Sequence, residues 1–249
     1  MMKLDTCLLI DNSNSRTKFA LGTVGGIGSP RILSTGELTV SVIRELLSDW
    51  CFDRVYACSV VPAARAVIAE ALGEYPVNWL SADAVSKVDF SAYPGVSTLG
   101  ADRIANALAA VAHVPLPLVA VDMGTATTFE VVVQGGVCPC FAGGIITPGF
   151  KSFAACLPSN TALLPAVDAG APARVIGRTT REAMSAGVVA GYAGMLDSLL
   201  DGIESELGES VSVVLTGGDA AMFGPLLRHR SICVASLTLQ GLAVWAGVL

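Results

Sequence analysis

The 249-residue sequence predicts an α/β fold made of two similar halves with a cleft between them. The first observation is a repeated strand–turn–strand template, LLIDNSNSRTKFAL from Leu8 and VAVDMGTATTFEVV from Val119. In each copy an apolar run ends in an aspartate, a small residue follows two positions later, and a threonine lies six positions after the aspartate. The second observation is that predicted strands and helices alternate, which favours a sheet with helical crossovers. A duplicated α/β fold satisfies both.

The first half is predicted to open with a hairpin whose turn covers residues 11–17. Residues 38–50 have the spacing of a helix, with Val40, Ile43 and Leu47 on one face. A second helix is predicted over residues 63–73, closed by Gly73. The other elements expected in this half are strands at 31–35, 54–62 and 77–82 and a helix at 100–114.

The second half is predicted to repeat the hairpin from Val119 and to add a strand within residues 137–146. Residues 211–220 read as a strand followed by a tight turn. Helices are expected at 150–157 and 180–206, then one ending near Leu227, and a last one at 239–248. We expect the domain boundary near residue 115, which gives domains of residues 1–115 and 116–249.

Hydrophobic residues form 53% of the chain and charged residues only 14%, so a membrane protein has to be considered. The most apolar segment is interrupted by His113, Pro115 and Asp122, and we expect no spanning helix of roughly 20 residues. The first residues lack the pattern of a signal peptide. The sequence therefore predicts a cytoplasmic protein whose apolar surplus forms a large core and a subunit interface.

The net charge of −6 and the absence of a basic run argue against nucleic acid as the main partner. The seven cysteines form no paired framework. Cys138 and Cys140 make a C-x-C pair, but no second Cys or His pair has the spacing of a zinc site. Free thiols in a reducing compartment are the expected state.

Both aspartate turns collect groups that bind polyphosphate. Phosphoryl transfer depends on backbone donors, hydroxyl groups and an acid that holds a cation. The alternative is that each is an ordinary hairpin turn. The repeated offsets after two buried strands favour phosphate binding. The groups concerned are Asp11, Asn14, Ser15, Thr17 and Lys18 in the first turn and Asp122, Thr125 and Thr127 in the second.

A third group of residues is the segment LGADRIAN. Gly100 lies where a helix starts, and the free N–H groups there favour an anion. Asp102 could accept a proton from a hydroxyl group, and Arg103 could pair with a carboxylate or phosphate. Taken alone, the same residues also fit an ordinary first helical turn beside a solvated arginine.

Two glycine turns, GGIITPG at 143–149 and LTGGDA at 215–220, could line a nucleotide site or only shape loops. The chain has neither a P-loop nor a G-x-G-x-x-G that opens a helix. His113 lies in an apolar stretch and His229 in the basic sequence RHR, so both are interpreted as structural or surface residues.

The motifs IDNSNSRTKFAL, ACSVVP, Y-P-x-x-x-x-LGADR, VDMGTATTFE, GGIITPG, IGRTTREAMSAG, LTGGDA and LTLQGL occur in this order. The set resembles the type III pantothenate kinases of the actin, hexokinase and acetate kinase superfamily. The resemblance implies two ribonuclease-H-like (actin-like ATPase) domains. It also implies ATP-dependent phosphorylation of pantothenate, the first step of coenzyme A synthesis. Members of the family are homodimers with the pantothenate site near the subunit interface.

The resemblance also assigns roles to residues of this chain. Asp102 matches the catalytic base, and Asp122 is similar to the ligand of a monovalent cation, K⁺ or NH₄⁺. The pantothenate contacts implied are Tyr93, Gly100, Ala101, Asp102, Arg103 and Thr180. The contacts implied for ATP and its Mg²⁺ are Asp11, Asn12, Ser13, Asn14, Ser15, Arg16, Thr17, Lys18 and Thr125.

One residue departs from the family pattern. Ser13 stands where the family usually has glycine. If this position needs a positive φ angle or very close approach to phosphate, serine costs roughly 1 kcal/mol or more. Two alternatives therefore accompany the kinase hypothesis. One is another small-molecule kinase, and the other is a non-enzymatic regulatory or accessory relative, which only Ser13 favours.

Overall fold

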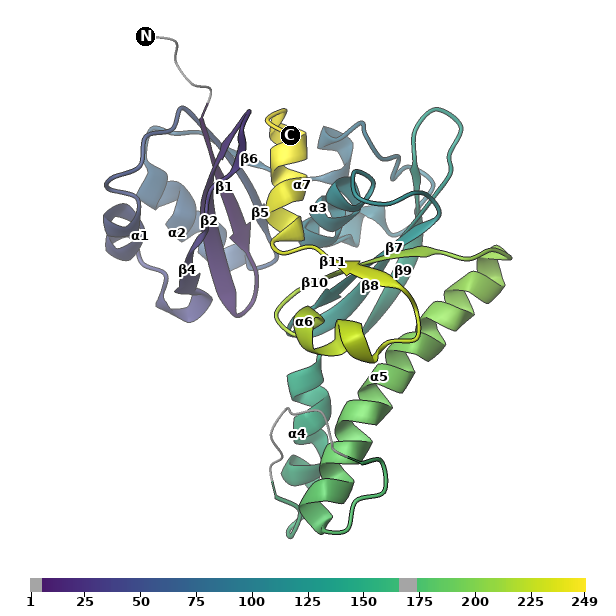
Figure 1. Cartoon of the computed structure of the whole chain (residues 1–249). Coiled ribbons are helices and arrows are strands. Elements are labelled where there is room, and N and C mark those ends of the chain that lie inside the picture. The colour runs from purple at the N-terminus through teal and green to yellow at the C-terminus, as the bar shows by residue number, and fades with distance from the viewer. Residues whose placement is uncertain (1–5, 166–173) are drawn as a thin grey trace. The chain divides into compact units, whose positions relative to one another are not determined.

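The computed structural model describes residues 6–165 and 174–249 (Figure 1). The chain forms two compact units. Unit 1 contains residues 1–116, 130–143 and 236–249, and unit 2 contains residues 117–129 and 144–235. Two segments from the second half of the sequence thus belong to unit 1. The domain boundary expected near residue 115 stays a prediction.

Unit 1 is built on a six-stranded mixed sheet in the order β3-β2-β1-β5-β6, with β4 also paired to β2. Strand β1 is central and buried along its whole length; it pairs antiparallel with β2 and parallel with β5. The predicted first hairpin, β1 and β2, therefore lies beside β5, which covers the first part of the strand predicted at 54–62. The bounds are β1 Cys7–Asn12, β2 Arg16–Thr23, β3 Gly26–Ile27, β4 Arg31–Ser34, β5 Arg54–Ser59 and β6 Val77–Trp79.

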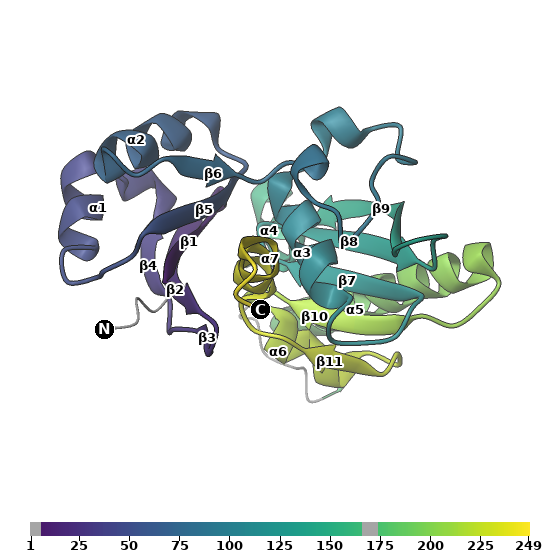
Figure 2. The same ribbon diagram turned by 90° about the horizontal axis from the view of Figure 1, so that it is seen from above.

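Helices cover both faces of this sheet. Helices α1 (Val40–Leu46) and α2 (Pro62–Leu72) bury Ile43 and Ile68 against Leu8 and Ile10 of β1. Helix α7 (Leu237–Ala246) lies on the opposite face and packs along α3 (Ala101–Ala110) (Figures 1 and 2). The last helix of the sequence therefore completes the core of the first sheet.

The second sheet has the order β11-β10-β7-β8-β9. Its central strands are apolar on both faces, and β10 pairs parallel with β7 and with β11. In unit 2, the rings of Phe150, Tyr192 and Phe223 pack on one another at centroid distances of 4.8–5.3 Å, with Phe150 edge to face on the other two. The bounds are β7 Leu118–Met123, β8 Ala126–Val133, β9 Cys140–Pro148, β10 Ser212–Thr216, β11 Ser231–Cys233, α4 Phe150–Asn160, α5 Thr180–Leu207 and α6 Ala220–Phe223.

The predicted α/β class is confirmed, with two mixed sheets. Three helices were predicted too long. The helices expected at 38–50 and 100–114 are α1 and α3, which cover only Val40–Leu46 and Ala101–Ala110. The helix expected to end near Leu227 is the four-residue α6 followed by a 3₁₀ turn at Gly224–Leu226, because Pro225 cannot donate the hydrogen bond that an α-helix needs. The short strands β3 and β11 were not predicted.

The expectation of no membrane-spanning helix needs a correction. Helix α5 is long and apolar enough to cross a membrane by length and composition alone. Half of its most apolar window is buried inside the structure, as in a core helix of a soluble protein. Its apolar character therefore serves packing in unit 2, for example through the buried Tyr192 and Leu200.

Candidate active site

The first aspartate turn is held by charge pairing across β1 and β2. Asp11, the fifth residue of β1, is 1% exposed and lies opposite Lys18 in the strand register. The Lys18 Nζ lies 2.9 Å from Asp11 Oδ2, and the Ser13 hydroxyl donates to Asp11 Oδ1 at 3.0 Å. The buried carboxylate is thus fixed by one cation and one hydroxyl group, both from the same turn.

Ser13 adopts this turn without backbone strain. Among the residues that the structure describes, Ser236 is the only residue other than glycine with a positive φ. The Ser13 N–H donates to the Arg16 carbonyl at 3.1 Å, and the Thr35 hydroxyl donates to the Ser13 carbonyl at 2.7 Å. The conformational need for glycine considered from the sequence is therefore absent, and the hydroxyl group gains a partner in Asp11.

A buried polar layer supports the turn from below. Asn12 donates from Nδ2 to the Thr17 hydroxyl at 2.7 Å and accepts from the Ser59 hydroxyl at 2.6 Å. Asn12 and Thr17 are both buried, whereas residues 14–16 at the tip are exposed. A turn that is held rigidly by buried hydrogen bonds and exposes polar groups at its tip is pre-organised to bind an anion.

Asp102 lies in the first turn of α3, directly after Gly100 and Ala101. Its Oδ1 accepts the Arg103 N–H at 2.8 Å. Burial raises the pKa of Asp102 above the usual aspartate value, and the charge of Asp11 raises it further. The first aspartate turn therefore lies within electrostatic reach of Asp102. The buried Cys58 thiol shows the same proximity: burial is the largest cause of its raised pKa, and the charges of Asp11 and Asp102 raise this pKa further.

Gly100 is required by the position of that carboxylate. A Cβ atom at residue 100 would lie 2.5 Å from Asp102 Oδ1. The backbone itself is in the extended region at φ −58° and ψ 136°, which other residues also adopt. The glycine thus serves close approach rather than an unusual backbone conformation.

Arg103 and Tyr93 are positioned by two residues that the sequence interpretation missed. The Arg103 Nε lies 2.8 Å from Oε1 of Glu130, which is fully buried on β8. Phe141 of β9 packs edge-on against the Tyr93 ring at 5.2 Å, and the Arg103 guanidinium lies 5.8 Å from the Phe141 ring centroid. Glu130 lies within the second template, in VDMGTATTFE, and this was the one available signal.

A cavity of about 670 Å³ opens in unit 1 beside the same loop. Its wall includes Gly100, Ala101 and Ser59, and on another side the Arg65 guanidinium stacks 4.4 Å above the Trp79 ring. Gly100 and Ala101, directly before Asp102, therefore face a cavity within unit 1.

The second aspartate turn belongs to unit 2 and is shaped by the two glycine motifs. Gly217 has φ +92°, and a Cβ there would lie 2.6 Å from Asp122 Oδ1 and 2.5 Å from the Met123 carbonyl oxygen. The Gly149 N–H donates to the Thr125 carbonyl at 3.2 Å. Gly149 and Gly217, from the motifs GGIITPG and LTGGDA whose role the sequence left open, therefore pack closely against this turn.

The structure distributes the expected site residues over both units. Unit 1 contains the Asp11–Lys18 turn, Tyr93 and the Gly100–Arg103 loop. Unit 2 contains Asp122 and Thr125 on the second turn and Thr180 as the exposed first residue of α5. Thr127 is not at the turn surface, because it is buried and its hydroxyl lies 2.6 Å from the Tyr192 hydroxyl.

Comparison of the structure with solved structures agrees with the fold. The chain resembles a Baf family transcriptional activator from Campylobacter jejuni with a TM-score of 0.61 at 19% identity, covering 94% of each chain. It also resembles the ethanolamine utilization protein EutJ from Carboxydothermus hydrogenoformans with a TM-score of 0.55 at 14% identity, covering 96% of this chain and 89% of the other. At these identities the likeness concerns the fold alone, which is that of the actin-like ATPases.

Sequence comparison identifies the family. Residues 7–202 match the family profile described as type III pantothenate kinase. A type III pantothenate kinase from Akkermansia muciniphila is 42% identical over 247 residues, which cover 98% of this chain and 99% of the relative. Another from Methylacidiphilum infernorum is 34% identical over 97% of this chain and 88% of the relative. The chain therefore belongs to the type III pantothenate kinase family.

Proposed function

We propose that Asp102 is the general base in the phosphorylation of pantothenate by this pantothenate kinase. Asp102 accepts the proton of the primary hydroxyl while that oxygen forms a bond to the γ-phosphorus of ATP. The bond from the γ-phosphorus to the bridging oxygen breaks, and ADP leaves with the electron pair. The products are 4′-phosphopantothenate and ADP.

The observation that carries this proposal is the environment of the Asp102 carboxylate. Burial and the nearby charge of Asp11 raise its pKa, which makes the carboxylate a stronger base than an ordinary exposed aspartate. Its hydrogen bond from the Arg103 N–H fixes one oxygen and leaves the other for a substrate hydroxyl. The Asp102 carboxylate approaches Gly100 so closely that a Cβ at residue 100 would lie 2.5 Å from Oδ1 and displace it.

Arg103 supplies the charge that recognises the carboxylate of pantothenate. Its Nε donates to Glu130, which orients the guanidinium, and a planar guanidinium is the group best suited to recognise a carboxylate. Tyr93, whose ring packs on Phe141, and the backbone of Gly100 and Ala101 are the other proposed pantothenate contacts. Thr180 is the expected contact from unit 2.

The Asp11–Lys18 turn and Thr125 bind the phosphates of ATP. The exposed tip at residues 14–16 offers N–H and hydroxyl donors, and Asp11 is the acid of this turn that would support the Mg²⁺ accompanying ATP. Asp122 and the neighbouring carbonyl oxygens would hold K⁺ or NH₄⁺, which supplies positive charge near the transferring phosphoryl group when it is bound.

The protein acts as a cytoplasmic homodimer. Leu163, Val175 and Ile176 are 91%, 78% and 83% exposed, and they lie in the chain between α4 and α5, two helices that pack against each other (Figure 1). Exposed apolar side chains of this kind favour a subunit interface. Light scattering after size exclusion should give twice the monomer mass of 25.5 kDa, and a monomer at micromolar concentration would refute this part.

The pH dependence of turnover tests the base directly. At saturating MgATP, kcat/KM for pantothenate should fall on the acid side with an apparent pKa above the ordinary aspartate value of about 3.9. An acid limb at or below that value would overturn the assignment of Asp102. The Ser13 turn is unstrained, so a need for a positive φ at this position no longer favours a non-enzymatic relative, and Ser13→Gly tests whether the side chain hinders phosphate.

A further inference from the structure

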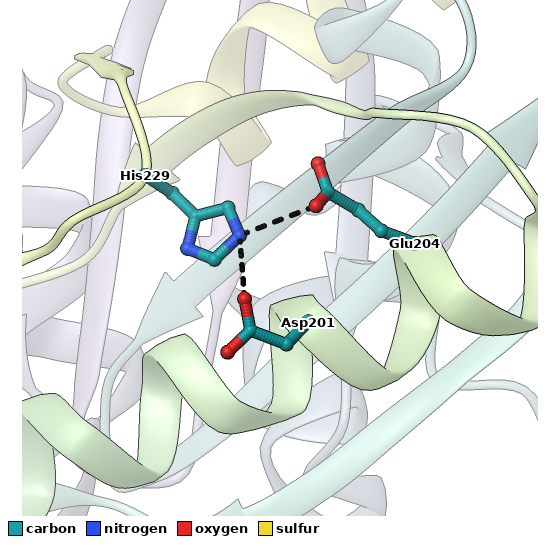
Figure 3. A group of neighbouring side chains, drawn as sticks. All are labelled: Asp201, Glu204 and His229. Carbon is teal, nitrogen blue, oxygen red and sulfur yellow. Dashed lines mark ion pairs between the residues drawn. The ribbon is translucent and has the colours of Figure 1, made fainter.

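A second group of titratable side chains lies in unit 2, away from the residues assigned to phosphate and pantothenate. Three acids, Asp197, Asp201 and Glu204, follow one another on α5 at spacings of four and three residues, which places them on one face of the helix. His229, from the segment between α6 and β11, points at this face (Figure 3).

The His229 ring is fixed by a buried carboxylate. Asp197 is 3% exposed, and its Oδ1 lies 2.8 Å from His229 Nδ1. The same carboxylate accepts the backbone N–H groups of Arg228 and His229 at 3.1 and 3.3 Å. Because Asp197 accepts, Nδ1 carries a proton, and the lone pair of the neutral ring is then on Nε2. This is the outer-shell arrangement that orients metal-binding histidines.

The His229 Nε2 atom has no good hydrogen-bonding geometry to the two acids that it faces. It lies 3.5 Å from Asp201 Oδ1 and 3.6 Å from Glu204 Oε2, which is too far for a hydrogen bond (Figure 3). Each acid uses its other oxygen elsewhere: Asp201 Oδ2 binds the Arg228 guanidinium at 2.8 Å, and Glu204 Oε1 accepts the Val211 N–H at 3.0 Å. The three facing atoms are therefore held around one spot.

The separations suit a metal ion at that spot. All three ligand atoms lie within 4.8 Å of one another. Zinc binds histidine nitrogen and carboxylate oxygen at about 2.0–2.2 Å in tetrahedral geometry, so two ligands of one ion lie about 3.4 Å apart. The distances of 3.5 and 3.6 Å from Nε2 are close to this value, and side-chain rotation would bring the two carboxylates to the same spacing.

We propose that Asp201, Glu204 and His229 form a binding site for a divalent first-row transition metal, with Zn²⁺ as the best match. One imidazole and two carboxylates favour this class over K⁺ or Mg²⁺, which take oxygen ligands, and water completes the coordination. Asp197 is the positioning residue. The bound ion would fasten the Arg228–His229 segment to α5 and stabilise unit 2 without taking part in phosphoryl transfer.

The test is a zinc titration of metal-free protein against a chromogenic chelator. The thiols of Cys138 and Cys140 are free and would compete for zinc, so all variants carry C138S and C140S. We expect one equivalent of Zn²⁺ to bind to this background. H229Q and E204Q should each weaken binding by at least about tenfold, and D197N by about 10–100-fold. H113Q alters the only other histidine in the chain and should leave binding unchanged.

A second readout separates metal binding from misfolding. Zinc should raise the melting temperature of the C138S/C140S protein and of H113Q, and should not raise that of H229Q or E204Q. In E204Q the Val211 N–H keeps its acceptor, so this variant should fold as the background does. The proposal is overturned if no saturable binding occurs up to about 1 mM zinc. It is equally overturned if H229Q and E204Q bind zinc as the background does, which would leave His229 as an ion-pair partner of α5.

Discussion

The close approach of Gly100 to the Asp102 carboxylate gives a quantitative prediction for Gly100→Ala. The new Cβ would lie 2.5 Å from Asp102 Oδ1, whereas an ordinary contact begins at 3.4 Å. The carboxylate must therefore move by about 0.9 Å, and misplacement of a catalytic group by roughly 1 Å can reduce turnover by about 100-fold. The hydrogen bond from the Arg103 N–H to the same oxygen is lost in the process.

Stability should change little in the same variant, because φ and ψ of Gly100 suit alanine and the group that moves is the end of a side chain. The assay is ADP release coupled to NADH oxidation, with thermal melting measured on the same samples. Gly36→Ala is the matched control, since its Cβ would meet no atom closer than 4.0 Å. A G100A enzyme with kcat within twofold of wild type would refute the reasoning, as would a loss of kcat explained entirely by unfolding.

Three further predictions concern the surroundings of the site. Glu130→Gln removes the charge that pairs with the 8%-exposed Arg103, and breaking such a buried pair should lower the unfolding free energy, measured in urea, by about 3–5 kcal/mol. KM for pantothenate should rise in the same variant. An unchanged unfolding free energy together with an unchanged KM would contradict the positioning role. Ser13→Gly should leave KM for ATP within about threefold of wild type, because the serine is unstrained and loses only one hydrogen bond of about 1 kcal/mol; a tenfold improvement would mean that serine does hinder phosphate. Burial raises the pKa of Asp102 in the folded state above its value in the unfolded state. Ionisation of Asp102 therefore lowers the unfolding free energy as the pH rises from the unfolded-state pKa to the folded-state pKa. The unfolding free energy of Asp102→Asn relative to wild type should therefore increase from acid to neutral pH. The same difference between variant and wild type at both pH values would contradict this.

The sequence predicted the elements whose signals are local. The hairpin at Asp11 and the helix after Gly100 follow from apolar runs and turn residues close together in the chain. The long helix α5 was also located within a residue or two, since its N-cap Thr179 and closing Gly208 are local signals. What failed locally was the length of three helices, among them α6, where Pro225 intervenes.

The supporting residues could not be predicted because they come from distant parts of the chain. Glu130 lies 27 residues after Arg103. Phe141 reaches Tyr93 only because residues 130–143 join unit 1. His229 was interpreted as a surface residue, since its partners lie on a helix about 30 residues earlier, and only packing brings them together.

The most direct test of the central claim is the rate of phosphoryl transfer in Asp102→Asn under single-turnover conditions, with pantothenate binding measured on the same protein by calorimetry. Asp49→Asn, which alters an exposed aspartate paired with Arg31, is the control. The account predicts that D102N binds pantothenate within a few-fold of wild type but transfers the phosphoryl group about 10²–10⁴-fold more slowly. Transfer at the wild-type rate in D102N would contradict it.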